Sequence, residues 1–357
     1  MNLTLKIKIL PNTEQKQRLK DLFTTFNSAC NDVSEVAYRL KTASQVKLHR
    51  ECYYGLREKY GLKAQLAVRA IGKVVENYRR DKTKKHVFKP MGAVVLDNKL
   101  MSYKGVDRIS ITSLTDRMVI PIVIGAYGTQ HFRRAKGQAD LVFKNGSFYI
   151  LQNCVYPDDD PIDPKDFLGV DLGVVNVAVD SDGEVFSGSV VKSVRHRHRR
   201  LRKRLQAKGT KSAKRRLKKL SGKERRFSID VNHCISKHIV QKAQRTGRGI
   251  AVEDLKHIRK RVTARRSGRA ILHNWAFAQL RSFIEYKAKI AQVLVIPVDP
   301  RNTSRTCPIC GCIDKRNRKT QSSFSCVSCG HSGMADKIAA LNIRSRASAN
   351  TPNVEAA

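Results

Sequence analysis

Two pairs of cysteines near the C-terminal end of the sequence have the spacing of a metal site. Cys307 and Cys310 form one CxxC pair and Cys326 and Cys329 form the other, with fifteen residues between the pairs and a glycine after each. Four thiolates close a tetrahedral shell around zinc, so this spacing predicts a structural zinc (Zn²⁺) site. An iron–sulfur or redox role is the alternative. Two further donors are close enough in sequence to replace one of the four: Cys312 and His331.

Three carboxylates stand at the edges of apolar segments, where a charge is costly. Asp171 interrupts an apolar run, Glu253 ends another, and Asp336 begins the last predicted helix. A carboxylate with apolar neighbours is expensive to desolvate unless it is paired. Each alone is explained by strand-end solubility or helix capping. Together they predict a two-metal site for phosphodiester hydrolysis, and all-oxygen ligands favour Mg²⁺ or Mn²⁺. Asp254 and Asp299 are the nearest substitutes.

The chain carries a large excess of positive charge. Seventy Lys and Arg against thirty Asp and Glu give a net charge of +40. Such a field favours a polyanionic partner, and nucleic acid fits better than a membrane because no basic amphipathic helix or lipidation signal is evident. Residues 190–226 hold eighteen Lys or Arg and one acid, Glu224. We interpret them as two basic helices around Gly209 that contact phosphates, with a merely solvated surface as the alternative.

Hydropathy and cysteine distribution indicate the cellular compartment. The most apolar run, "MVIPIVIGAY", is ten residues long and is broken by Pro121, which is too short to span a bilayer. Five of the nine cysteines cluster between 307 and 329, a distribution typical of a metal site in a reducing compartment. We therefore expect a soluble, intracellular protein.

The N-terminal half combines strands with a helical insert. Residues 1–10 alternate apolar and polar side chains, as a half-buried strand does. Residues 11–82 keep helical spacing after Asn12 and Gln15, which match a capping box. From residue 83 to 160 the period shifts to two, and an Asn-Gly pair at 145–146 indicates a hairpin. This order predicts a small β-barrel interrupted by a helical module.

The C-terminal half alternates strands and helices, which indicates an α/β layer with some parallel strands. A strand pair at 167–180 leads to a third strand at 184–188, and helices at about 227–246 and 270–291 each precede or follow a strand. The predicted segments, in order, are an α/β domain at 161–303, a zinc ribbon at 304–332, a last helix at 333–347 and a disordered tail at 348–357.

Several motifs in this half resemble those of TnpB proteins, the transposon-associated RNA-guided nucleases related to type V CRISPR effectors. "LGVDLGVVNVAV" resembles the first RuvC motif of that family, "IAVEDL" the second and "ADKIAALNI" the third. "TSRTCPICG" to "SCVSCG" resembles its zinc ribbon, and "NHCISKHIV" and "NWAFAQLRSFIEYKA" resemble further family segments. The specific matches cover roughly residues 160 to 345, while the N-terminal half agrees in layout only.

The resemblance implies a fold, an activity and partners. The fold is an RNase H-like (RuvC) nuclease core with an inserted zinc ribbon, preceded by a wedge-type β-barrel that a helical recognition module interrupts. Asp171, Glu253 and Asp336 would be catalytic ligands of Mg²⁺. The partners would be a guide RNA from the transposon end and double-stranded target DNA, cleaved beside a short transposon-adjacent motif. The setting would be the prokaryotic cytoplasm, at the nucleoid.

One position departs from the family pattern. The third RuvC motif usually carries Asn two residues after its aspartate, and here that residue is Ile338. A displaced helix start would change the geometry of Asp336. Three alternatives to an RNA-guided nuclease remain at this point: a nuclease-inactive RNA-guided DNA-binding regulator, a guide-independent RNase H-like nuclease or junction resolvase, and a zinc-ribbon transcription factor. The last of these offers no explanation for Asp171.

Overall fold

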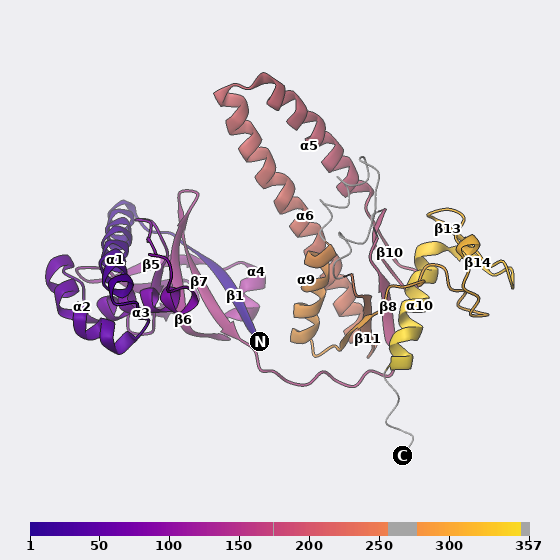
Figure 1. Cartoon of the computed structure of the whole chain (residues 1–357), viewed down its shortest axis with the longest axis horizontal. Coiled ribbons are helices and arrows are strands. Elements are labelled where there is room, and N and C mark those ends of the chain that lie inside the picture. The colour runs from indigo at the N-terminus through magenta and orange to yellow at the C-terminus, as the bar shows by residue number, and fades with distance from the viewer. Residues whose placement is uncertain (174, 256–276, 351–357) are drawn as a thin grey trace, which may run out of the picture. The chain divides into compact units, whose positions relative to one another are not determined.

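The computed structural model describes residues 1–173, 175–255 and 277–350. The chain divides into two compact units, Met1–Asp158 and Asp159–Ala357 (Figure 1). The first seven residues of the helix predicted at 270–291, and the last seven of the predicted tail, lie outside the described residues. No helix in the described ranges combines the length and apolar content needed to cross a membrane.

The N-terminal unit is built on a sheet of seven strands in the order β2-β6-β7-β1-β5-β4-β3. All neighbouring strands in it are antiparallel. In the first strand Leu5, Ile7 and Ile9 are buried while Lys6 and Lys8 are exposed, which is the alternation expected from the sequence. The strands are β1 (Asn2–Ile9), β2 (Val94–Leu96), β3 (Met101–Lys104), β4 (Arg108–Thr112), β5 (Arg117–Val123), β6 (Ala135–Lys144) and β7 (Ser147–Val155).

This sheet curls until its two edges nearly meet. The edge strands β2 and β3 are joined by residues 97–100 alone, which can span about 18 Å. In a flat sheet of this size the edges would lie about 29 Å apart. The hydroxyl of Tyr103 in β3 also donates to Oε1 of Gln152 in β7 at 3.0 Å, although the strands are not neighbours in the sheet. The predicted small barrel is therefore confirmed in a nearly closed form.

Three helices follow β1 and form the predicted helical module. The Asn12 side chain accepts from the Gln15 amide at 2.8 Å and the Gln15 side chain accepts from the Asn12 amide at 3.1 Å, so the capping box is present. Phe23 and Phe26 are fully buried on the inner face of the first helix. The helices are α1 (Thr13–Arg39), α2 (Gln45–Tyr60) and α3 (Ala64–Arg80).

Two elements of the barrel region were not predicted from the sequence, and one turn was. The turn is Asn145-Gly146, where both residues have positive φ, 52° and 77°, as the hairpin signal requires. The unpredicted elements are β3 and a short helix, α4 (Ala126–Phe132). Neither is long enough for a period of 2 or 3.6 to show in the sequence.

The C-terminal unit is built on a five-stranded mixed sheet in the order β10-β9-β8-β11-β12. Strand β8 is parallel to β11, and β11 is parallel to β12, while β9 and β10 are antiparallel additions. The expected α/β layer with some parallel strands is thus present. The strands are β8 (Phe167–Asp171), β9 (Asn176–Asp180), β10 (Val185–Ser187), β11 (Gly249–Glu253) and β12 (Val295–Val298).

Helices cover both faces of this sheet. Leu168 and Val170 of β8 pack in one apolar cluster with α6 (Lys211–Arg245) and α9 (Phe277–Ile290). Phe167 faces the opposite way and packs against Ile343 of α10 (Ala335–Asn350). Figure 1 shows α10 on one side of β8 and α6 with α9 on the other. Helix α10 includes the first three residues of the predicted disordered tail, so that prediction was wrong for 348–350.

A long basic hairpin of helices extends from this unit (Figure 1). Helix α5 (Ser189–Lys208) ends at Gly209, whose φ of 62° is the left-handed conformation that glycine adopts at low cost. Helix α6 then runs without a break, so the separate helix predicted at 227–246 is the second half of α6. Glu224, the single acid of the basic segment, contacts Arg202 and lies 3.7 Å from His198, which ties α6 to α5.

Candidate functional site

Asp171 and Glu253 end two neighbouring parallel strands. Val170 of β8 pairs with Val252 of β11, so the next residue of each strand, Asp171 and Glu253, lies at the same edge of the sheet. Neighbouring strands are about 4.8 Å apart, which places the two carboxylates side by side. Glu253 is 8% exposed, and Asp171 is partly buried.

Asp336 reaches the same region from the first turn of α10. The Asn176 side chain, at the start of β9, donates to Oδ2 of Asp336 at 2.9 Å. Arg318 donates to the other carboxylate oxygen at 3.4 Å. Ile338 does not displace the helix start, because it is 3% exposed and packs into a small core with Phe324 and the cysteines of the ribbon.

Asp171 senses the negative charges of the other two carboxylates. Burial, followed by the negative charges of Glu253 and Asp336, raises the pKa of Asp171 to about 8. Burial also raises the pKa of Glu253, while the hydroxyl of Thr303 acts in the opposite direction. Arg346 lowers the pKa of Glu253 and Arg318 lowers both pKa values, but they do not offset the burial. The site is therefore short of positive charge, which a hard divalent cation would supply to these oxygen donors.

The two substitute carboxylates are placed differently. Asp254 accepts from Nη1 of Arg281 at 2.6 Å and is bound in that ion pair. Asp299 is exposed and accepts from the backbone amide of Arg301 at 3.0 Å, although its charge also raises the pKa of Glu253. Asp171, Glu253 and Asp336 therefore remain the better candidates for a shared cation.

Three residues of this site were not found by sequence reasoning: Asn176, Thr303 and Arg318. Asn176 is the one of the three with a detectable signal, since it is a polar residue that opens the apolar strand "NVAVD". Thr303 and Arg318 lie in segments of mixed polar residues, where nothing in their spacing marks them. Their contacts join segments that are 50 and 18 residues apart in the chain.

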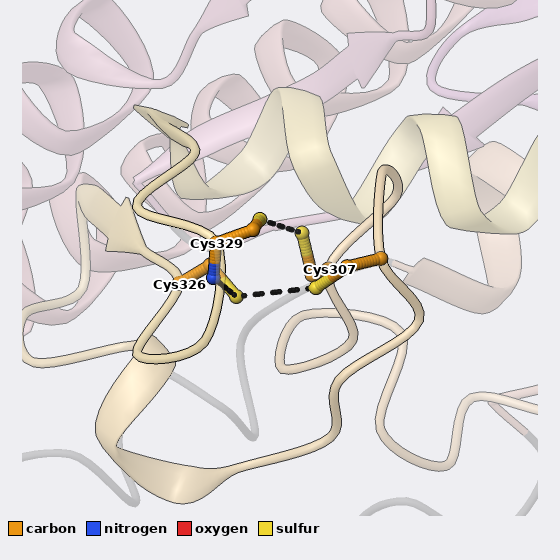
Figure 2. A group of neighbouring side chains, drawn as sticks. Cys307, Cys326 and Cys329 are labelled. Carbon is orange, nitrogen blue, oxygen red and sulfur yellow. Dashed lines mark hydrogen bonds between the residues drawn. The ribbon is translucent and has the colours of Figure 1, made fainter.

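The four predicted cysteines converge on one point in the zinc ribbon. Their sulfurs all lie within 4.8 Å of one another. Sγ of Cys307 is 3.6 Å from Sγ of Cys329, and Sγ of Cys310 is 3.5 Å from Sγ of Cys326 (Figure 2). Tetrahedral zinc with Zn–S bonds of 2.3 Å would hold sulfurs about 3.8 Å apart, so the geometry fits zinc. The ribbon strands are β13 (Ser323–Ser325) and β14 (Ser332–Met334), with a 3₁₀ turn, η1 (Lys315–Asn317), before them.

The surroundings of Cys326 favour the thiolate that a metal requires. Backbone amides of Cys329 and Ser328 point at its sulfur at 3.5 Å and 3.4 Å and lower the pKa of the thiol. The spare donors Cys312 and His331 do not belong to the group of four. Over the described ranges of the chain, these four cysteines are the one group of three or more donors that converges in this way. Glu253 and Asp336 act on Asp171 through their charges, but the three carboxylates do not converge in this way.

Family models match two stretches of the chain. The family described as "Probable transposase" matches residues 152–259. The family described as "Cas12f1-like, TNB domain" matches residues 277–343. Asp171 and Glu253 fall within the first match, and the four cysteines and Asp336 fall within the second.

Sequence relatives agree with these models. The chain is 29% identical over 266 residues to a TnpB-like protein of Methanocaldococcus jannaschii, covering 68% of this chain and 92% of that protein. The chain is thus similar to a TnpB-like protein over most of its length. It is 29% identical over 253 residues to a CRISPR-associated endodeoxyribonuclease Cas12f1 of Syntrophomonas palmitatica, covering 64% of this chain but only half of that protein. The resemblance to TnpB proteins seen in the sequence is thus confirmed.

Solved structures of Cas12 effectors share the fold. A Cas12f1–sgRNA–target DNA complex matches with a TM-score of 0.60 at 18% identity, covering 92% of this chain and 83% of that one. The mini-RNA-guided endonuclease CRISPR-Cas_phi3 matches with a TM-score of 0.58 at 11% identity, covering 99% and 93% of the two chains. At these identities the likeness concerns the fold alone.

Proposed function

We propose that this protein is an RNA-guided DNA endonuclease that cleaves double-stranded DNA next to a short transposon-adjacent motif. The observation that carries the proposal is the placement of Asp171 and Glu253 at one edge of the sheet, with Asp336 close enough to raise the pKa of Asp171. The sheet that holds them, with helices on both faces, would be a RuvC-like core of the RNase H type. Relatives named as endodeoxyribonucleases support the same assignment.

In this proposal the three carboxylates are ligands of two Mg²⁺ ions, with Mn²⁺ as the possible substitute. Bound there, such ions would activate the attacking water and stabilise the leaving oxygen of a phosphodiester. Residues of the chain orient these ligands. Asn176 holds one carboxylate oxygen of Asp336, Arg318 holds the other, and Thr303 holds a carboxylate oxygen of Glu253. These contacts fix the directions in which the ligand oxygens point.

The basic hairpin would hold nucleic acid. A cavity of about 630 Å³ opens between α5, α6 and α9, and Arg195, Arg202 and Arg225 line it. Guanidinium groups there suit the phosphates of a bound strand. The partners proposed are a guide RNA from the transposon end and double-stranded target DNA, as in the solved Cas12f1 complex with sgRNA and target DNA. Base pairing would then read the sequence while the protein reads duplex shape and the short motif.

The other parts of the chain receive roles by the same reasoning. Residues 1–10 and 83–160 would form the wedge barrel, and residues 11–82 the recognition module. The zinc site would be structural, since four thiolates leave no open position for chemistry. Residues 304–332 would thereby present Arg318 to Asp336 from a rigid support.

The proposal is tested by the RNA that accompanies the protein and by DNA binding without cleavage. The protein, expressed together with its native locus and purified, should carry one discrete RNA. This RNA should end beside the gene in a 3′ segment of variable sequence. Asp171→Asn should keep binding DNA complementary to that segment while cleavage falls below detection. Asp163→Asn, the same substitution at an exposed position before β8, should cleave normally. A heterogeneous mixture of RNAs, or loss of DNA binding in Asp171→Asn, would contradict the proposal.

A further inference from the structure

The carboxylate of Glu253 is held by a side chain from the segment that leads into the zinc ribbon. The hydroxyl of Thr303 donates to Oε1 of Glu253 at 2.5 Å. Thr303 is 3% exposed and Glu253 is 8% exposed, so water does not compete for this contact. The two residues are 50 positions apart in the chain and come together only in the fold.

The direction of this hydrogen bond follows from the chemistry of a hydroxyl. Thr303 has a single hydroxyl proton, and its oxygen also lies 3.2 Å from the carbonyl oxygen of Pro300. The carboxylate is both closer and charged, and hydrogen bonds to charged acceptors are the shorter and stronger ones. The proton therefore goes to Glu253. That leaves Oε2 and one lone pair of Oε1 for a cation.

Helix α10 fixes the backbone from which Thr303 projects. Nδ2 of Asn342 donates one hydrogen to the carbonyl of Thr303 at 2.7 Å and the other to the carbonyl of Thr306 at 2.8 Å. Asn342 is 6% exposed, and both of its amide hydrogens are used. Thr306 directly precedes the zinc ligand Cys307. The same helix carries Asp336, six residues before Asn342.

We propose that Thr303 is the positioning residue for Glu253, and that Asn342 holds Thr303 in place. This inference rests on the proposed function, in which Glu253 binds a divalent cation. A ligand whose direction is already fixed by a neighbouring hydrogen bond loses less freedom when the cation arrives, and removal of such a partner costs 10- to 100-fold in metal affinity as an order of magnitude. Hydrogen bonds of Thr303 and Asn342 thereby connect Glu253 to the segment that enters the zinc ribbon.

Three substitutions at one position separate the hydroxyl from the methyl group of Thr303. Thr303→Val keeps the shape and loses the hydroxyl, Thr303→Ser keeps the hydroxyl and loses the methyl, and Thr303→Ala loses both. Mn²⁺ binding is measured by electron paramagnetic resonance on the zinc-loaded full chain, together with cleavage as a function of Mn²⁺ concentration. The matched control is Thr306→Val, because the Thr306 hydroxyl donates at 2.8 Å to the carbonyl of Asn302 and not to Glu253.

We expect Mn²⁺ affinity to fall about 10-fold or more in Thr303→Val and Thr303→Ala, and to stay within about 2-fold in Thr303→Ser and Thr306→Val. The opposite ranking, with valine like the wild type and serine weakened, would show that Thr303 only fills space and would overturn the proposal. Zinc content and thermal unfolding identify a variant that fails to fold. If valine does so, the alanine and serine pair decides, because alanine adds no atom beside the carboxylate.

A further variant, Glu253→Gln, separates this inference from the function on which it rests. If Glu253→Gln weakens Mn²⁺ binding and Thr303→Val does not, the positioning role of Thr303 is wrong while the metal site stands. If Glu253→Gln leaves Mn²⁺ binding unchanged, Glu253 is not a metal ligand, and the proposed function and this inference both fail.

Discussion

Gly169 of β8 packs directly against the backbone of α10. A Cβ atom on Gly169 would lie 2.0 Å from the carbonyl oxygen of Ala340 and 2.7 Å from the amide nitrogen of Arg344. Carbon–oxygen contacts between backbones are about 3.3 Å or longer, so Gly169→Ala requires α10 to move about 1.3 Å away from β8. Because the first two obstacles are backbone atoms, rotation of a side chain does not relieve the clash.

The displacement affects both stability and chemistry. Overpacking costs about 1–3 kcal/mol, and the backbone contact places this substitution at about 3 kcal/mol. That corresponds to a fall of about 6–12 °C in Tm for a unit of this size. Asp336 lies one helical turn before Ala340 and moves with the helix. A ligand misplaced by about 1 Å costs about 100-fold in rate.

Thermal unfolding measures the effect on stability. Single-turnover cleavage, at a temperature where the variant is folded, measures the effect on chemistry. The control is Gly72→Ala in the middle of α3, where a Cβ meets no atom within 4 Å. That change should be neutral or stabilise by about 0.5–1 kcal/mol. A Gly169→Ala protein with unchanged Tm and unchanged cleavage would refute the close packing of α10 on β8 and, with it, the placement of Asp336.

Three further predictions concern zinc, pH and salt. Cys326→Ser should lose zinc and lower the Tm, measured by metal analysis and calorimetry, whereas Cys312→Ser should keep its zinc; equal loss in both would mean that the ligand set is wrong. In zinc-loaded protein without Mg²⁺, the pKa of Asp171 is raised from 3.8 to about 8. Its contribution to stability is therefore complete below about pH 4 and lost as the pH rises through 8; urea unfolding of Asp171→Asn should lack that loss, and parallel pH profiles would disprove the assignment. Replacing Arg215 and Arg216 of α6 by Gln should reduce the slope of log K against log salt for DNA binding by about 2, and an unchanged slope would exclude them as phosphate contacts.

The sequence allowed prediction of those parts of the site that local patterns encode. Asp171 and Glu253 were predictable because one carboxylate interrupts a run of apolar residues and the other ends one. Parallel strands bring their carboxyl ends to one edge of a sheet. The cysteines were visible because a CxxC pair is itself the geometry of a metal knuckle. The capping box at Asn12 was visible for the same reason, since its hydrogen bonds lie within three residues.

Contacts between distant segments were not predictable in this way. Thr303 and Arg318 contact the acid cluster only because the ribbon folds back on α10, and neither residue type stands out in its own segment. The break predicted near residue 227 was wrong because it rested on a change in composition, from basic to mixed. Helix α6 continues through that stretch, Gly222 included. Short elements such as β3 and α4 were missed because tertiary packing, not a periodic pattern, maintains them.

We propose that Asp171, Glu253 and Asp336 form the active site of an RNA-guided DNA endonuclease. The most direct test incubates the protein and its own RNA with a plasmid library that carries the complementary target next to randomised flanking bases, with Mg²⁺ present. We expect linear plasmid enriched for one short flanking motif, and none with Asp171→Asn or without Mg²⁺. Cleavage that ignores the complementary target, or that persists in Asp171→Asn, would contradict the proposal.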